Sequence, residues 1–151
     1  MDLGLLRRAV ELARVNGAEG QLPFGAVIAN GDEVVATGVN TALRDNDPTA
    51  HGEVVAVRAA CRELGTISLA GTTLYSSCEP CPICHTTAIA AEVDRVVYAA
   101  PKEWVPDLGT PFAPVLIDIQ AAARRLDPDR IVQIELVEAR EPFAVFLETR
   151  R

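Results

Sequence analysis

The chain has 151 residues, the length of one ordinary domain built around one hydrophobic core. Hydrophobic residues make up 49% of the chain and aromatic residues only 5%, so we expect a mostly aliphatic core. The formal net charge of −7 disfavours nucleic acid as a partner, because polyanions are bound by basic patches, and favours a small neutral or cationic molecule.

The first third of the chain predicts a helix followed by a β-hairpin. Apolar residues recur with a helical period over residues 3–16, and the segment Gly17 to Gly20 ends this helix. Residues 24–29 form a short apolar strand. The turn signal Asn30-Gly31-Asp32 then leads into a second strand over residues 33–39.

The middle third predicts two helices, each beginning at a proline. A polar loop covers residues 40–47, and Asp47-Pro48 then opens a helix that runs to about Leu64. Aspartate is a favoured N-cap and proline suits the first helical position. A strand over residues 74–77 follows, and Pro80 begins the second helix, which ends near Glu92.

The last third predicts strand, loop, helix and strand. Residues 95–100 are rich in β-forming side chains, and three prolines make residues 101–113 a loop. A helix is expected over residues 113–126 and a last strand over residues 131–138. The alternation of strands and helices predicts a three-layer α/β/α sandwich, in a single domain that spans residues 1–151.

The cysteines indicate metal or redox chemistry rather than a structural disulfide. No segment is long and apolar enough to span a bilayer, and the N-terminus lacks the pattern of a signal peptide, so we expect a cytoplasmic protein without membrane contact. In a reducing compartment, Cys81 and Cys84, three residues apart, favour metal binding or redox exchange. Cys61, on the apolar face of its helix, is expected to pack in the core.

Two short motifs carry ligand types that zinc prefers: T-A-H-G-E at 49–53 and C-E-P-C-P-I-C at 78–84. Zinc takes nitrogen and sulfur ligands in tetrahedral geometry, and a catalytic zinc keeps one position for water. His51, Cys81 and Cys84 would supply three ligands, and Glu53 could move protons without being one. The combination of H-x-E with P-C-x-x-C is a known signature of zinc deaminases. The ligands fall in the first turns of two predicted helices, whose dipoles favour thiolate over thiol.

Other interpretations of these motifs stay open at this point. Cys81 and Cys84 could form a structural zinc knuckle or a redox pair, and Cys78 could be a fourth ligand that leaves no place for water. A zinc-stabilised scaffold without catalysis is a further alternative. The presence of Glu53 argues against a scaffold, because a scaffold needs no proton carrier.

Three residues near the motifs have two possible roles each. Glu79 would cap the metal-bearing helix or face the substrate pocket, with capping favoured. His85 would be a surface residue or part of the pocket wall. Trp104, in the proline-rich loop, would be a hydrophobic anchor or a lid that stacks on a substrate.

The sequence resembles the cytidine deaminase superfamily and, within it, the bacterial guanine deaminase group. The resemblance covers nearly the whole chain and is carried by L-P-F-G-A-V-I at 22–28, G-V-N at 38–40, D-P-T-A-H-G-E-V at 47–54, L-Y-S-S-C-E-P-C-P-I-C at 74–84, V-V-Y-A-A at 96–100 and E-A-R-E-P-F at 138–143. It implies the cytidine deaminase-like fold, with a mixed five-stranded sheet between helices. It also implies Zn²⁺ as cofactor and a heterocyclic small molecule as substrate.

The resemblance further implies particular contacts with the substrate. Asn40 would contact the base and Phe24 would pack near it, while Ala50 would line the same site. In the guanine deaminase group the C-terminal segment, here about 127–151, is exchanged between two subunits, and an acidic residue in it assists proton transfer. Glu138 is the matching position, with Glu141 a weaker candidate, and a homodimer is expected.

Two departures from the family pattern bear on the substrate. Gly52 stands where the family usually has alanine, and the helix after Cys84 has His85 and Ala90 where guanine deaminases tend to have a small or apolar residue and an aromatic one. Guanine is the best single substrate, with cytosine, guanosine, an aminotriazine or a pterin as alternatives. Adenosine in tRNA is disfavoured by the acidic charge and by a C-terminus with only Arg150 and Arg151.

Overall fold

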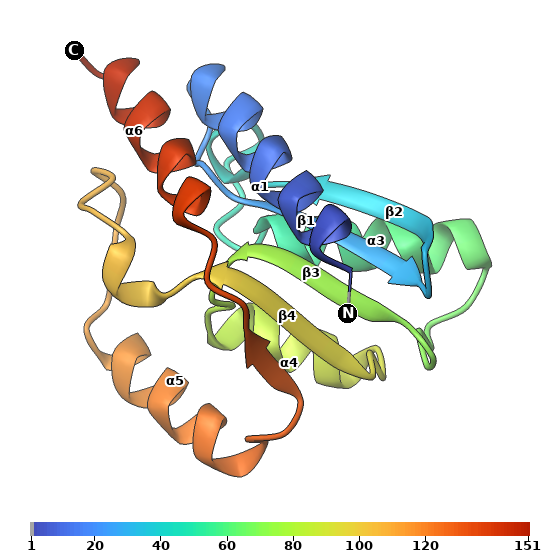
Figure 1. The fold of residues 1–151 in the computed structure, drawn as a ribbon. Coiled ribbons are helices and arrows are strands. Elements are labelled where there is room, and N and C mark those ends of the chain that lie inside the picture. The colour runs from blue at the N-terminus through green and yellow to red at the C-terminus, as the bar shows by residue number, and fades with distance from the viewer. Residues whose placement is uncertain (1) are drawn as a thin grey trace.

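The computed structural model describes residues 2–151 and contains one mixed five-stranded sheet in the order β2-β1-β3-β4-β5 (Figure 1). The strands are β1 (Gly25–Asn30), β2 (Glu33–Val39), β3 (Thr73–Cys78), β4 (Arg95–Ala100) and β5 (Ile131–Gln133). β1 pairs antiparallel with β2 and β3, whereas β3, β4 and β5 run parallel. The sequence-based prediction of a mixed five-stranded sheet is therefore confirmed.

Helices cover both faces of this sheet, as Figure 1 shows. The α-helices are α1 (Leu3–Ala18), α2 (Ala42–Asp45), α3 (Gly52–Leu64), α4 (Pro82–Ala90), α5 (Val115–Leu126) and α6 (Glu141–Glu148). Two 3₁₀ turns, η1 (Lys102–Trp104) and η2 (Val137–Arg140), lie in the second half of the chain. α1 and α6 pack side by side over one face, and α3 and α4 cover the other.

The alternation of side chains along β1 divides the core in two. Successive strand residues point to opposite faces, so Val27 and Ala29 pack with α1, whereas Ala26 and Ile28 pack with α3. The first core cluster includes Leu6, Val10, Tyr75, Val97 and Phe143, and the second includes Val57, Ala60, Leu74, Ala88 and Val96. These two clusters on either side of one sheet make the three layers that the sequence predicts.

A close approach between β2 and α3 fixes the beginning of α3. A Cβ atom at Gly38 would lie 2.4 Å from the carbonyl oxygen of Gly52 and 2.4 Å from the backbone nitrogen of Ala56. No side chain larger than hydrogen fits there without backbone movement. The first turn of α3 can therefore lie directly on the sheet, and the residue just before it, His51, is held close to the strands.

Two helix starts differ from the sequence-based prediction. α3 begins at Gly52 rather than at Pro48, because the Asp47 side chain accepts hydrogen bonds from the backbone N–H and hydroxyl of Thr49 and closes a separate turn. The short helix α2 lies in the segment expected to be a polar loop. α4 begins at Pro82, with Cys81 as its N-cap, rather than at Pro80.

The C-terminal segment differs more. The last strand, expected over residues 131–138, ends at Gln133, and Glu138 lies in η2 instead. The helix α6 was not predicted. It begins at Glu141-Pro142 and buries Phe143 and Phe146 three residues apart, on the face that packs against α1.

In the part of the chain that the structure describes, no helix has both the length and the apolar character required to cross a bilayer.

Candidate metal centre

Two helix N-termini bring the three expected ligands together. His51 is the N-cap of α3, Cys81 is the N-cap of α4, and Cys84 lies in the first turn of α4. His51 Nδ1 lies 3.2 Å from Cys81 Sγ and 3.5 Å from Cys84 Sγ, and the two sulfurs are 3.6 Å apart. Tetrahedral zinc with Zn–S near 2.3 Å and Zn–N near 2.0–2.1 Å requires ligand separations of about 3.5–3.8 Å. Two of the three separations lie in this range and the third, between His51 Nδ1 and Cys81 Sγ at 3.2 Å, is about 0.3 Å shorter, so a small outward movement of His51 or Cys81 gives the spacing that zinc requires.

The electrostatics of this cluster favour thiolate at neutral pH. The hydrogen bond from Cys84, with those from His51, lowers the pKa of Cys81 to about 4. The hydrogen bond to Cys81 raises the pKa of His51 above its ordinary value. The pKa of Cys84 is raised, first by its bond to Cys81 and then by burial. The pair of thiols therefore loses one proton readily and the second only at higher pH, in two separate titration steps.

Glu53 lies beside the cluster without belonging to it. Its side chain is buried, and burial raises its pKa. Cys84 Sγ lies 3.2 Å from Glu53 Oε2, and Ser76 Oγ lies 2.6 Å from Glu53 Oε1. Ser76 Oγ also lies 2.7 Å from the carbonyl oxygen of Cys78, which can only accept. Both contacts of Ser76 are hydrogen bonds at the same time only when Glu53 carries a proton and donates it to Ser76.

Cys78 is not part of the three-residue cluster that the described residues form. It is buried in the first core cluster, and burial raises its thiol pKa far above the ordinary value. A neutral thiol in an apolar core is a poor zinc ligand, because the metal binds thiolate. Cys61 is partly buried against the second core cluster, in agreement with the packing role expected for it.

Backbone hydrogen bonds connect the residues expected to contact a substrate. The N–H of Asn40 donates to the carbonyl of Phe24 at 3.0 Å, and the N–H of Thr41 donates to the carbonyl of Ala50 at 3.0 Å. Asn40 Oδ1 accepts from the N–H of Ala42 at 2.9 Å. The Phe24 ring packs edge-on against Phe143 of α6, with centroids 5.9 Å apart. The strand β1, the loop before α3 and α6 are thus joined near the metal-bearing helix.

The structure narrows the roles of Trp104 and His85. Trp104 packs against the first core cluster and carries the guanidinium of Arg140 4.0 Å from its ring centroid, which agrees with an anchor. His85 is buried, so it is not a surface residue. His85 Nε2 lies 3.6 Å from Asp127 Oδ2 at the end of α5, beyond hydrogen-bond distance.

Two acidic residues lie elsewhere than expected. Glu79 does not cap α4, whose N-terminus has no side-chain cap among the described residues; its carboxylate accepts instead from Gln120 and from the Lys102 N–H. Glu138 accepts a hydrogen bond from Arg7 of α1 at 3.0 Å, and a backbone hydrogen bond together with this one lowers the pKa of Glu138. In this arrangement Glu138 engages α1 rather than the metal cluster.

Sequence reasoning did not single out Ser76 and Gln120. Ser76 contacts Glu53 from β3, and Gln120 contacts the segment before Cys81 from α5. One signal for Gln120 was available: it is a polar residue within the mostly apolar run from Val115 to Ala123. The position of Ser76 follows from strand pairing, which the sequence does not display.

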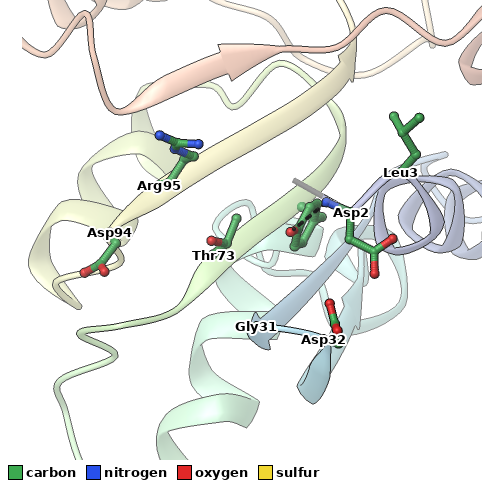
Figure 2. A pocket seen from close by; sticks show the side chains of 8 residues that line it. Asp2, Leu3, Gly31, Asp32, Thr73, Asp94 and Arg95 are labelled. Atoms are coloured by element: carbon green, nitrogen blue, oxygen red, sulfur yellow. Dashed lines mark hydrogen bonds between the residues drawn. The ribbon is translucent and has the colours of Figure 1, made fainter.

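A surface hollow of about 720 Å³ lies at the other end of the sheet (Figure 2). Figure 2 shows Thr73 and Arg95 at its wall, and these residues begin β3 and β4, whereas the metal ligands follow the end of β3. Its lining consists of Asp2, Leu3, Gly31, Asp32, Thr73, Tyr75, Asp94 and Arg95. Ligands of open α/β sheets bind beyond the carboxyl ends of the strands, which here is the end of the metal cluster.

Comparisons with known proteins agree with this geometry. The family model of the cytidine and deoxycytidylate deaminase zinc-binding region matches residues 1–100. Guanine deaminase from Bacillus subtilis is 40% identical over 141 residues, which are 91% of this chain and 88% of that protein. A tRNA-specific adenosine deaminase from Buchnera aphidicola is 33% identical over 99 residues, which are 66% of this chain and 61% of that protein.

The fold is also that of a solved relative. The X-ray structure of guanine deaminase from Bacillus subtilis has a TM-score of 0.65 and 33% identity, and the match covers 98% of this chain and 95% of that one. The family-model match, over residues 1–100, includes the segments that hold His51, Cys81 and Cys84. The chain therefore belongs to the cytidine and deoxycytidylate deaminase family and is a zinc-dependent deaminase, a hydrolase that acts on carbon–nitrogen bonds.

Proposed function

We propose that the chain deaminates guanine to xanthine, with His51, Cys81 and Cys84 as zinc ligands and Glu53 as proton carrier. The observation that carries this proposal is the tetrahedral spacing of three ligand atoms beside a buried carboxyl group. Similarity to a guanine deaminase over nearly the whole of both chains supports guanine as the substrate. Sequence similarity to the tRNA-specific adenosine deaminase from Buchnera aphidicola covers only two thirds of this chain, although the fold is shared with a solved tRNA deaminase over 95% of it.

The proposed reaction needs a metal-activated water and a group that transfers protons, and the chain has residues for both. His51, Cys81 and Cys84 would hold the zinc ion, which would supply a water molecule whose pKa is lowered from 15.7 toward about 7. Glu53 would accept the first proton of the attacking water and deliver it to a ring nitrogen. It would then accept the second proton from the hydroxyl group formed on the carbon and deliver it to the amino group, which leaves as ammonia. Burial raises the pKa of Glu53, which favours its role as a proton donor to the ring nitrogen and to the departing amino group. Water replaces the amino group, so the carbon gains a carbonyl oxygen and ammonia leaves.

An ammonia-release assay tests the proposal. Guanine, guanosine, cytosine, adenine, aminotriazines, pterins and a tRNA anticodon stem-loop would be compared at equal concentration. We expect guanine to give the highest kcat/KM, with little dependence on salt. Activity on the stem-loop that falls steeply with salt would instead indicate a tRNA substrate, since phosphate contacts are screened by ions. No ammonia from any substrate, with zinc bound, would indicate the scaffold.

We also propose that the functional unit is a homodimer. α6 packs on α1 of its own chain, and Phe143 lies against Phe24. If residues from about 127 onward are exchanged, the contacts of α6 with α1 and with Phe24 form between subunits. The proposed role of Glu138 in proton transfer requires in addition that Glu138 leaves its present partner Arg7. Light scattering should give about twice the mass of the chain, and Glu138→Gln should reduce kcat. A monomer with full activity would refute the homodimer, and an unchanged kcat in Glu138→Gln would refute the role of Glu138.

A further inference from the structure

Glu79 is a buried acidic residue next to the metal ligands that the proposed chemistry does not use. Only 4% of its side chain is exposed. Its backbone N–H donates to the carbonyl of Ala100 at 2.8 Å, which fixes it at the end of β3, two residues before Cys81. An ionised carboxylate is costly to bury unless its oxygens are paired, so its partners show what holds this part of the chain.

Both oxygens of the Glu79 carboxylate have partners. Oε1 accepts from the backbone N–H of Lys102 at 3.3 Å, and Oε2 accepts from Gln120 Nε2 at 3.0 Å. The guanidinium of Arg124, one turn further along α5, forms an ion pair with the same Oε2. The Glu79 carboxylate thus links the end of β3 to α5 and to the loop after β4 by hydrogen bonds and an ion pair.

Gln120 forms a second bond that reaches the metal ligand itself. Its Nε2 also donates to the carbonyl oxygen of Pro80 at 3.1 Å. That carbonyl belongs to the peptide that joins Pro80 to Cys81, and Cys81 Sγ lies 3.2 Å from His51 Nδ1. Among the residues of α5, Gln120 alone is buried. The helix is therefore held against the site chiefly by a polar contact rather than by an apolar face.

We propose that Gln120 is a positioning residue of the metal centre. It orients the Pro80–Cys81 peptide through two acceptors, the Glu79 carboxylate and the Pro80 carbonyl, while Arg124 balances the buried charge of Glu79. Metal ligands must be held within about 0.5 Å of their working positions, and groups behind the ligands set that position. The inference rests on the proposed ligand role of Cys81 and adds a residue that lies outside both metal motifs.

The decisive variant is Gln120→Met, which keeps the length of the side chain and removes both donated bonds. Its matched control is Gln133→Met, the same change at an exposed position of β5. Zinc affinity is measured by chelator competition, and ligand geometry by the absorption bands of the cobalt-substituted protein. We expect Gln120→Met to weaken zinc binding by roughly 10–100-fold and to alter the cobalt bands. At saturating zinc, kcat should fall while KM changes little. Gln133→Met should match the wild type.

A rescue variant separates hydrogen bonding from shape. Gln120→Lys keeps donors for both the Glu79 carboxylate and the Pro80 carbonyl, so it should recover most of the zinc affinity. Equal losses in Gln120→Met and Gln120→Lys, or wild-type affinity and cobalt bands in Gln120→Met, would overturn the proposal. If Gln120→Met does not fold, the zinc affinity of Arg124→Met tests the proposal instead. The half-exposed guanidinium of Arg124 can be removed with less disruption of the fold. Unchanged zinc affinity in Arg124→Met would overturn the proposal.

The test of Gln120 does not depend on whether guanine is the substrate. Zinc affinity and cobalt spectra are measured without any substrate, so they report on Gln120 even if guanine is not deaminated. Conversely, a wild type that deaminates guanine while Gln120→Met binds zinc normally would leave the proposed function intact and remove this role of Gln120.

Discussion

Glu53 is surrounded by groups that hold its carboxyl group in place and favour its protonated form. Cys84 Sγ contacts one carboxyl oxygen, and Ser76 Oγ contacts the other. Burial raises its pKa, so the carboxyl group holds a proton to higher pH than an exposed glutamate does. These surroundings support the proposed role of Glu53 as proton carrier.

Replacing Glu53 with glutamine should separate metal binding from catalysis. Glutamine keeps the shape but cannot accept a proton, so turnover should fall by about 10²–10⁴-fold or more. Zinc content, measured by atomic emission, should stay at one ion per chain because Glu53 is not a ligand. Ammonia release close to that of the wild type would remove Glu53 from its assigned role.

The zinc-free protein should show an unusual thiol titration. Because the pKa of Cys81 is lowered to about 4 while that of Cys84 is raised, one thiolate should be present at pH 7. Thiolate absorbance at neutral pH should be lost as the pH falls toward 4, rather than near the ordinary thiol value of about 8.5. His51→Ala removes a hydrogen bond that lowers this pKa, so the loss should shift to higher pH. A wild-type titration near the ordinary value would contradict the geometry.

At the scale of elements, the metal centre depends on how closely α3 lies on the sheet. The residue that permits this approach is Gly38, which faces the backbone of Gly52 and Ala56. α4 is held from another direction, by the bonds that join Glu79 and Pro80 to α5. The ligands are therefore set by the packing of two helix N-termini and not by a single rigid loop.

Substitution of Gly38 should disturb this packing. A Cβ in Gly38→Ala would lie 2.4 Å from backbone atoms, so the helix must move, and we expect a loss of about 1–3 kcal/mol or more in unfolding free energy. Gly52→Ala is the matched control, since its Cβ would lie 3.2 Å from the nearest atom and alanine favours a helix by about 1 kcal/mol. Urea denaturation measures both. A Gly38→Ala variant as stable as the wild type would show that α3 can shift without cost.

At the scale of the whole molecule, a metal at this site links parts of the fold that are distant in sequence. His51 and Cys81 are separated by 30 positions and begin two different helices on the same face of the sheet. A ligand that binds only the folded state adds stability in proportion to the logarithm of its free concentration over Kd. Zinc should therefore contribute to stability as well as to chemistry.

Removal of zinc should lower Tm. With free zinc at about 1,000 times Kd, the stabilisation is about 4.1 kcal/mol, which chelation would abolish. Cys81→Ser should have a lower Tm that responds little to chelator, because a ligand is missing. Thermal scans with and without EDTA measure this. A wild-type Tm unaffected by complete zinc removal would show that the site does not stabilise the fold.

The sequence by itself determined the candidate ligand set, the layered architecture and most of the strands. His51, Cys81 and Cys84, with Glu53 beside them, could be singled out as candidates because zinc chemistry demands particular side chains at short spacing, and such spacing is visible in a linear chain. The strands β1 to β4 were found within one or two residues, since runs of buried apolar residues between turn signals are local patterns. The alternation of those strands with helices was enough to predict the sandwich.

Only the tertiary structure decided what surrounds the ligands. α6 was missed because its helix is stabilised by burying Phe143 and Phe146 on α1, more than 120 positions away. The Asp47 turn displaced the start of α3, and Glu79 turned to α5 rather than to its neighbouring helix. These outcomes depend on which distant groups compete for the same hydrogen bonds, and that competition exists only once the chain is folded.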